Sequence, residues 1–331
     1  MQETRVAVIG SGSFSGSDFV DLLLEDPSMR VLGLSRSPES HPVFLPHLRH
    51  GTDRYTFRQA HLVSEMERVI AALDAFEPHY VVNFAAQGEV RSSFDHPVEY
   101  FRTNTLAMIE LSEALRRRSW LRKYVHISTP EIYGTCDHAV TENQPMNPSS
   151  PYAASKAGAD MFNGVLHRTA DFPVSWVRAT NVYGAHQQLY RIMPRTAIYR
   201  KLGRILRLDG GGVAVKSYIH IRDVSRGELA VMLRGRPGQV YHLSPDGGIS
   251  IREVVEMICR MAGADFASSV EIGPERPGQD KAYVLDSTLA RTELDWAPRI
   301  SFEEGVRALV DWVETNWEII RTLPLDYEFR P

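Results

Sequence analysis

Short apolar runs alternate with longer amphipathic stretches along the first half of the chain. The runs at 5–10, 30–36, 79–86, 123–129 and 173–184 are rich in β-branched residues and have the length of buried strands. Between them, apolar residues at helical spacing predict helices at 15–26, 63–76, 98–118 and 150–170. Strands that alternate with helices predict βαβ units and a parallel sheet covered on both faces. We therefore expect an α/β fold with a doubly wound, Rossmann-type sheet.

The pattern becomes less regular after residue 184. Loops rich in glycine and proline at 209–215 and 272–280 accompany two amphipathic helices predicted at 249–263 and 301–317. We expect residues 1–184 to form a Rossmann-type domain, to which about 217–250 return. The remainder of 185–331 would form a smaller α/β lobe that binds the substrate, with ligands at the carboxyl ends of the strands between the two.

Composition and charge exclude several classes of protein. No apolar run approaches the roughly 20 residues of a membrane span, and the net charge of -4 comes without a basic stripe, which argues against nucleic-acid binding. The two cysteines, Cys136 and Cys259, are far apart and fit neither a disulfide framework nor a metal-ligand spacing. We expect a cytoplasmic protein with no metal site.

A glycine-containing loop follows the first predicted strand. Residues 10–16, GSGSFSG, lead directly into a helix, whose N-terminus and free N–H groups suit a pyrophosphate. The GxGxxG pattern is not met, because Ser15 replaces its last glycine; a GxxGxxG pattern is met at Gly10 and Gly16, with Ser13 in the middle. Taken alone, the loop would also fit a tight turn that binds nothing.

The end of the second predicted strand bears on the choice of cofactor. It reads Leu34-Ser35-Arg36-Ser37 and contains no carboxylate for a free ribose 2′-hydroxyl. A guanidinium flanked by hydroxyls binds phosphate well. The tip therefore favours NADP over NAD, although an arginine beside a cofactor without a 2′-phosphate is also compatible with it.

Tyr152 and Lys156 are four residues apart on a predicted helix and therefore share one face. An ammonium close to a phenol lowers the pKa of that phenol and makes it a usable base. The preceding strand ends in HISTPEIYG, which places Thr129 and Glu131 upstream of this pair. His126 within that strand is expected to be packed and to have no catalytic role.

Six motifs occur together and in one order: GSGSFSG, NFAAQGEVRSSF, HISTPEIYG, SPYAASK, RATNVYG and YIHIRDV. Together they resemble the extended short-chain dehydrogenase/reductase family, in the branch that acts on nucleotide sugars. The resemblance implies a Rossmann domain for NAD(P) and a small C-terminal domain for a nucleotide hexose. It also implies a homodimer through a four-helix bundle, with the bundle helices around 98–118 and 150–170.

The resemblance implies roles for individual residues. Tyr152 would be the base on the sugar 4-hydroxyl, Lys156 would hold the nicotinamide ribose, and Thr129 would hydrogen-bond the 4-oxygen. The implied cofactor-binding residues are Gly10, Gly12, Ser13, Phe14, Ser15, Gly16, Ser35, Arg36, Ser37, His61, Leu62, Ala85, Ala86, Gln87, Asn104, Tyr152 and Lys156. The implied substrate-binding residues are Glu89, Thr129, Asn181, Arg191, Lys216 and Arg276.

Pro130 distinguishes among the reactions of the family. Many 4,6-dehydratases of the family have Thr-Asp-Glu at this place, with the glutamate as base at C5 and the aspartate as acid at the 6-oxygen. This chain has Thr-Pro-Glu and lacks the aspartate, as do some dehydratases that the family contains. The resemblance to them implies that one carboxylate can do both tasks, and we expect Glu131 to do so. The sequence therefore predicts a 4,6-dehydratase with a regenerated cofactor.

Three alternatives stay open at this point. A UDP-glucuronate decarboxylase would need a cation for the C6 carboxylate, and Arg191 and Arg195 are candidates. A 4-epimerase has no evident use for Glu131. A non-catalytic NADP-sensing protein has no evident use for both Tyr152 and Lys156.

Overall fold

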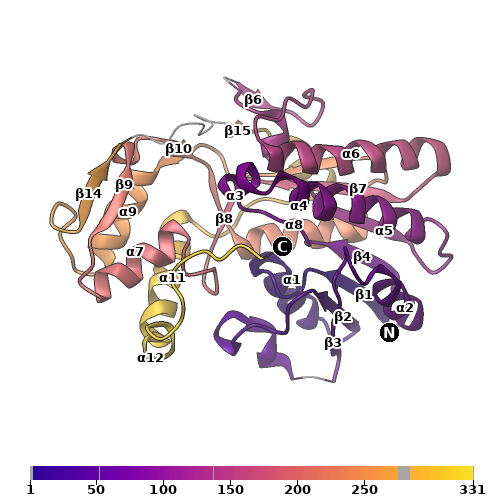
Figure 1. Cartoon of the computed structure of the whole chain (residues 1–331), viewed down its shortest axis with the longest axis horizontal. Coiled ribbons are helices and arrows are strands. Elements are labelled where there is room, and N and C mark those ends of the chain that lie inside the picture. Colours follow the sequence, from indigo (N-terminus) through magenta and orange to yellow (C-terminus); the bar gives the residue numbers. More distant parts are fainter. Residues whose placement is uncertain (1–2, 52, 137, 275–283, 331) are drawn as a thin grey trace.

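A seven-stranded parallel sheet forms the centre of the larger part of the molecule, in the order β12-β7-β5-β4-β1-β2-β3 (Figure 1). The computed structural model describes residues 3–51, 53–136, 138–274 and 284–330. The strands of the sheet are β1 Thr4–Ile9, β2 Met29–Ser35, β3 Tyr55–Gln59, β4 Tyr80–Asn83, β5 Lys123–Ile127, β7 Val174–Ala179 and β12 Val240–Leu243. The order reverses between β1 and β4, which is where Rossmann-type sheets bind dinucleotides. The predicted fold class is confirmed.

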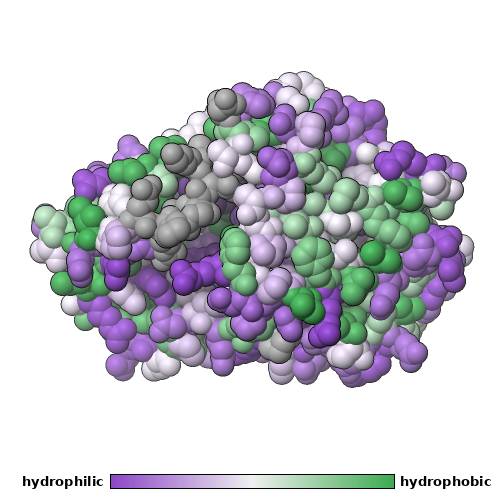
Figure 2. Space-filling model, turned by 45° about the horizontal axis from the view of Figure 1, so that its top comes forward, coloured by the Kyte–Doolittle hydropathy of each residue, from purple (hydrophilic) through white to green (hydrophobic). Residues whose placement is uncertain are grey.

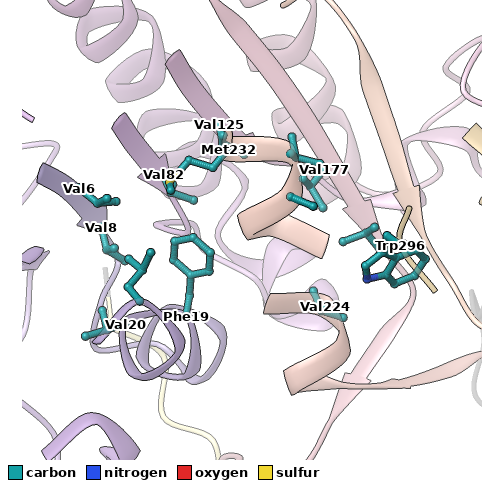
Figure 3. Close-up of a cluster of buried hydrophobic side chains, with 14 of the residues drawn as sticks. Val6, Val8, Phe19, Val20, Val82, Val125, Val177, Val224, Met232 and Trp296 are labelled. Carbon is teal, nitrogen blue, oxygen red and sulfur yellow. The ribbon is translucent and has the colours of Figure 1, made fainter. Parts of the chain in front are cut away.

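The alternation of side chains along β1 explains how helices cover both faces of the sheet. Val6 and Val8 point into one core, together with Phe19 of α1 (Phe14–Leu24) and Met232 of α8 (Ile221–Arg234), as Figure 3 shows. Ala7 and Ile9 point into the opposite core, beneath α2 (Met66–Phe76), α5 (Ala107–Leu115) and α6 (Pro151–Ala170). Strands buried on both faces read as continuous apolar runs, and this is why they could be recognised in the sequence.

The helix predicted at 98–118 is interrupted. It consists of α4 (Pro97–Phe101), a π-helical segment (Arg102–Leu106) and α5. The π-helical segment contains Asn104, a fully buried amide. Single π turns inside α-helices are frequent at functional sites. The predicted helix is therefore present, with a π-helical segment whose Thr103 lines the cavity described below.

The smaller part of the molecule is built on its own core. α7 (Ile192–Lys201), α9 (Ile251–Met261) and α11 (Phe302–Thr315) pack around buried aliphatic and aromatic side chains such as Met193, Ile258 and Trp312. Two short ladders join this part: β9 (Leu206–Asp209) with β14 (Val270–Gly273), and β10 (Val215–Lys216) with β13 (Ile249–Ser250). The domain boundary at residue 184 stays a prediction. β12, which comes after that residue in the sequence, belongs to the main sheet.

The chain also contains several shorter helices and strands. They are α3 (Val90–Asp95), β6 (Ala139–Val140), β8 (Asn181–Tyr183), β11 (Tyr218–His220), β15 (Val284–Leu285), α10 (Thr288–Leu294) and α12 (Trp317–Ile320). After α12 the chain crosses from the smaller part to the larger one (Figure 1), where Arg330 contacts Arg36 and Gln87. Among the described residues, no helix is both long and apolar enough to cross a membrane.

Candidate active site

The loop between β1 and α1 brings the backbone close to the neighbouring strands. Gly10 has φ +83°, and a Cβ there would lie 2.6 Å from the main-chain nitrogen of Ala85, while a Cβ on Gly16 would lie 2.3 Å from the carbonyl oxygen of Gly10. Both positions therefore require glycine. Ser13, where a third glycine was looked for, caps α1 instead: its hydroxyl accepts a hydrogen bond from the Gly16 N–H at 3.0 Å.

A cavity of about 520 Å³ opens above this loop at the carboxyl ends of β1, β2 and β4. Eleven of the predicted cofactor residues line it: Gly10, Gly12, Ser13, Ser35, Arg36, Ser37, His61, Leu62, Ala85, Ala86 and Gln87. Phe14, Ser15 and Gly16 begin helix α1 beside the cavity but do not line it. The cavity, the close backbone and the helix N-terminus together fit a dinucleotide.

The tip of β2 contains a carboxylate that the sequence analysis missed. Glu39, two residues beyond Ser37, lines the same cavity as Arg36. The guanidinium of Arg36 is engaged already, since its Nη1 donates to the carbonyl oxygen of Arg330 at 2.7 Å. Burial lowers the pKa of Arg36 from its usual value. The tip therefore offers both an acidic group and a partly occupied cation.

Asn104 shapes the cavity from behind and does not line it. Its Oδ1 accepts from the Gln87 N–H at 2.8 Å, and its Nδ2 donates to the Gln87 carbonyl at 3.0 Å and to Ser155 Oγ at 3.0 Å. These bonds join the loop after β4 to helix α6. The Gln87 side chain donates to the Arg330 carbonyl at 2.6 Å, so the C-terminal segment also reaches this wall.

Thr129, Glu131 and Tyr152 lie together at the end of β5. The Thr129 hydroxyl caps the 3₁₀ turn Pro130–Tyr133 by accepting from the Glu131 N–H at 3.3 Å, and it also hydrogen-bonds the Tyr152 phenol. Burial and then the charge of Glu131 raise the pKa of Tyr152, while the bond to Thr129 and the charge of Arg191 lower it. The raised pKa differs from the lowered one expected from the Tyr152–Lys156 spacing, because desolvation of the phenol outweighs the favourable charges.

Lys156 is buried on the inner face of α6. Its Nζ donates to the carbonyl oxygen of Ile127 at 2.7 Å. Burial lowers the pKa of Lys156 to about 8, and the nearby carboxylate of Asp160 acts against that decrease. The ammonium is thus held against the end of β5, close to where Thr129 begins.

The predicted substrate residues have different surroundings. Glu89 forms an ion pair with Arg191, with 3.2 Å between carboxylate and guanidinium, and the effect of Arg191 on the pKa of Tyr152 places this pair near the phenol. Asn181 donates from Nδ2 to the Ser217 carbonyl at 3.1 Å, and Lys216 lies on β10. Arg276 falls outside the described residues.

Arg195, considered above for a C6 carboxylate, binds the C-terminal segment. Its Nη2 donates to the Leu325 carbonyl and to the Asp326 carboxylate, both at 3.0 Å. It is therefore engaged in holding residues 325–326. The same segment continues to Phe329, whose ring stacks on His96 at 4.0 Å between centroids.

Comparisons with known proteins agree with this geometry. The model of the GDP-mannose 4,6 dehydratase family matches residues 8–309. A dTDP-glucose 4,6-dehydratase of Streptomyces griseus is 33% identical over 324 residues, which are 95% of this chain and 96% of the relative. The crystal structure of a dTDP-glucose 4,6-dehydratase from Streptomyces venezuelae with NAD bound superposes with a TM-score of 0.88 at 30% identity, over 95% of this chain and 98% of that one. A dTDP-glucose 4,6-dehydratase from Bacillus anthracis in complex with NAD has a TM-score of 0.84 at 26% identity, over 96% and 98% of the two chains.

Proposed function

The chain belongs to the GDP-mannose 4,6 dehydratase family and is a nucleotide-sugar 4,6-dehydratase, and on this premise we propose which residues act and on what substrate. Thr129, Glu131, Tyr152 and Lys156 form the catalytic set, and dTDP-glucose is the substrate. The observation that supports this catalytic set is that Thr129 hydrogen-bonds Tyr152, while the charge of Glu131 raises the pKa of Tyr152. The substrate is inferred from the Streptomyces griseus relative, which matches over nearly the whole chain.

The catalytic side chains have distinct tasks in the proposed mechanism. Tyr152 takes the proton of the sugar 4-hydroxyl, and the Thr129 hydroxyl orients the 4-oxygen. The cavity lined by Gly10, Gly12 and Ser13 would hold NAD, which would supply a hydride acceptor and donor and be unchanged after each turnover. Glu131 removes the C5 proton, which the 4-ketone has acidified, and delivers it to the departing 6-oxygen, which leaves as water. When C6 is reduced, C5 regains a proton, and the proton that Tyr152 took from the 4-hydroxyl balances it.

Pro130 leaves Glu131 to act as both base and acid. Proline has no side-chain proton to give, and it lies buried at the start of the 3₁₀ turn. General acid–base catalysis by one group is typically worth about 10²–10⁴-fold. A Glu131→Gln variant should lose this factor in product formation and still oxidise C4, so that reduced cofactor accumulates at 340 nm. Full turnover by Glu131→Gln would overturn the proposal.

NAD is the proposed cofactor in place of the NADP that the β2 tip first favoured. Glu39 can accept from a free ribose 2′-hydroxyl, and a carboxylate there repels a 2′-phosphate. Arg36 already donates to Arg330. Titration with NAD⁺ and NADP⁺ tests this preference. NAD⁺ should bind more tightly than NADP⁺, and Glu39→Gln should reduce the difference between the two affinities. Tighter binding of NADP⁺ by the unmodified chain would contradict it.

The chain is further proposed to form a homodimer through α4, α5 and α6. Large apolar side chains are exposed on α3, α4, the π-helical segment and α6: Phe94, Val98, Phe101, Leu106, Met161 and Val165. Figure 2 shows hydrophobic surface gathered on one side of the molecule. A surface of this kind marks an interaction site. Light scattering should give twice the 37.4 kDa chain mass, and Met161→Glu should give one chain mass.

A cytoplasmic location stays a prediction, supported by the two free thiols.

A further inference from the structure

A buried group of charged and polar side chains lies beneath the catalytic residues. Asp160 follows Lys156 by one turn on the inner face of α6, and its side chain is 1% exposed. Its Oδ2 accepts from Ser128 Oγ at 2.6 Å and from Arg178 Nη2 at 2.8 Å. Ser128 directly precedes Thr129. Asp160 therefore joins the catalytic end of β5 to the helix that contains Tyr152 and Lys156.

The group extends to the turn that contains Glu131. The second terminal nitrogen of Arg178 donates to the Tyr133 hydroxyl, which also lies 2.7 Å from His242 Nε2. Tyr133 is the last residue of the 3₁₀ turn. Asp160 itself lies on α6, bonds Ser128 at the end of β5 directly, and reaches the 3₁₀ turn through Arg178. It is thus linked to all three elements that hold catalytic side chains.

We propose that Asp160 is a positioning residue of this dehydratase: it holds β5 and the 3₁₀ turn against α6 and keeps the Lys156 ammonium protonated. The proposal rests on the catalytic roles proposed above. The charge matters because Lys156 is buried, and burial of an ammonium without a compensating anion favours the neutral amine.

The charged and titratable groups around Asp160 and Lys156 determine in which direction Asp160 changes the pKa of Lys156. From β5, His126 Nε2 lies 3.6 Å from Asp160 Oδ1, and burial lowers the pKa of His126 to about 3, so that it is neutral at pH 7. From β7, Arg178 neutralises part of the Asp160 charge. Tyr152 shares α6 with Lys156. The carboxylate of Asp160 supplies the negative charge that acts on the pKa of Lys156.

Two substitutions of opposite charge effect test the proposal. In Asp160→Asn the anion is lost, so the alkaline limb of the kcat–pH profile, where Lys156 loses its proton, should move to lower pH by about one unit or more. In Arg178→Gln the carboxylate is less neutralised, so the same limb should move to higher pH. Ser128→Ala keeps both charges and is the matched control: kcat should fall while the limb stays in place, and Asp160→Glu should restore the limb.

A second measurement does not depend on turnover. The pKa of Lys156 in the folded chain is about 8, below its ordinary value of 10.5. Between these two pH values the unfolded chain therefore binds more protons than the folded chain. The free energy of unfolding should accordingly rise with pH across this window. In Asp160→Asn the rise should begin at lower pH, and in Arg178→Gln at higher pH. Shifts in the same direction, or no shift in either variant, would overturn the role of Asp160. An unmodified chain that dehydrates no nucleotide sugar would overturn the proposed function instead, and the unfolding measurement would still decide the charge effect.

Discussion

Replacement of Asn104 by alanine tests how the interrupted helix supports the cofactor cavity. The amide is fully buried and makes three hydrogen bonds, two of them to the main chain of Gln87. Ser155 Oγ, the third partner, keeps a bond to the Tyr152 carbonyl at 2.7 Å. Asn104→Ala therefore leaves two buried main-chain groups unpaired. At about 1–3 kcal/mol for each such group, the free energy of unfolding should fall by about 2–6 kcal/mol.

The assay is urea unfolding followed by circular dichroism, together with titration of NAD⁺. Thr105→Val is the matched control, because Thr105 lies in the same π-helical segment and donates one hydrogen bond, at 2.7 Å, to the Ser155 carbonyl. We expect the control to cost about 1 kcal/mol. Asn104→Ala should also weaken NAD⁺ binding, since Gln87 lines the cavity. A cost for Asn104→Ala no larger than that of the control would refute the account of this segment.

Three further predictions concern the loop, the histidines and the C-terminal segment. Gly16→Ala should reduce NAD⁺ affinity at least tenfold in a binding titration, because its Cβ would meet the Gly10 carbonyl at 2.3 Å. Gly164→Ala is the control for a helical glycine, because its Cβ would meet only the flexible end of Arg168, at 3.2 Å. Burial lowers the pKa of His126 and of His242 to about 3, so below pH 6.5 the unfolded chain binds more protons than the folded one. The free energy of unfolding should therefore fall from pH 6.5 towards pH 3, and an equally steep fall in His126→Gln would exclude a contribution from that ring. Phe329→Ala should speed the release of bound NAD in a stopped-flow chase, since the ring holds the segment whose next carbonyl bonds Arg36 and Gln87, and an unchanged rate would show that the segment does not retain the cofactor.

The sequence predicted those elements whose pattern is local and unambiguous. Strands buried on both faces read as apolar runs, and the helices around 150–170, 249–263 and 301–317 correspond to α6, α9 and α11. The strand β3 was missed, because only Tyr55 of its five residues is buried and its exposed positions carry polar groups. Helix α8 was missed because charged residues interrupt its apolar spacing, although Asp223 and Glu228 are buried.

The candidate site was predictable where it depends on short motifs and unpredictable where it depends on long-range contacts. The positions of Thr129, Glu131 and Tyr152 follow from a strand end and one helix, and the structure brings them together. The contact of Arg330 with Arg36 spans 294 residues, and no local pattern announces it. The raised pKa of Tyr152 likewise follows from how deeply the phenol is enclosed, which the spacing to Lys156 does not reveal.

Transfer of a label within one sugar tests the central claim most directly. Nucleotide glucose that carries deuterium at C4 would be incubated with the NAD-loaded protein, and the product examined by mass spectrometry and proton NMR. A 4,6-dehydratase should release one water and move the deuterium from C4 to C6, with no net reduction of the cofactor. Recovery of the sugar at unchanged mass, or of a dehydrated product without deuterium at C6, would contradict the account.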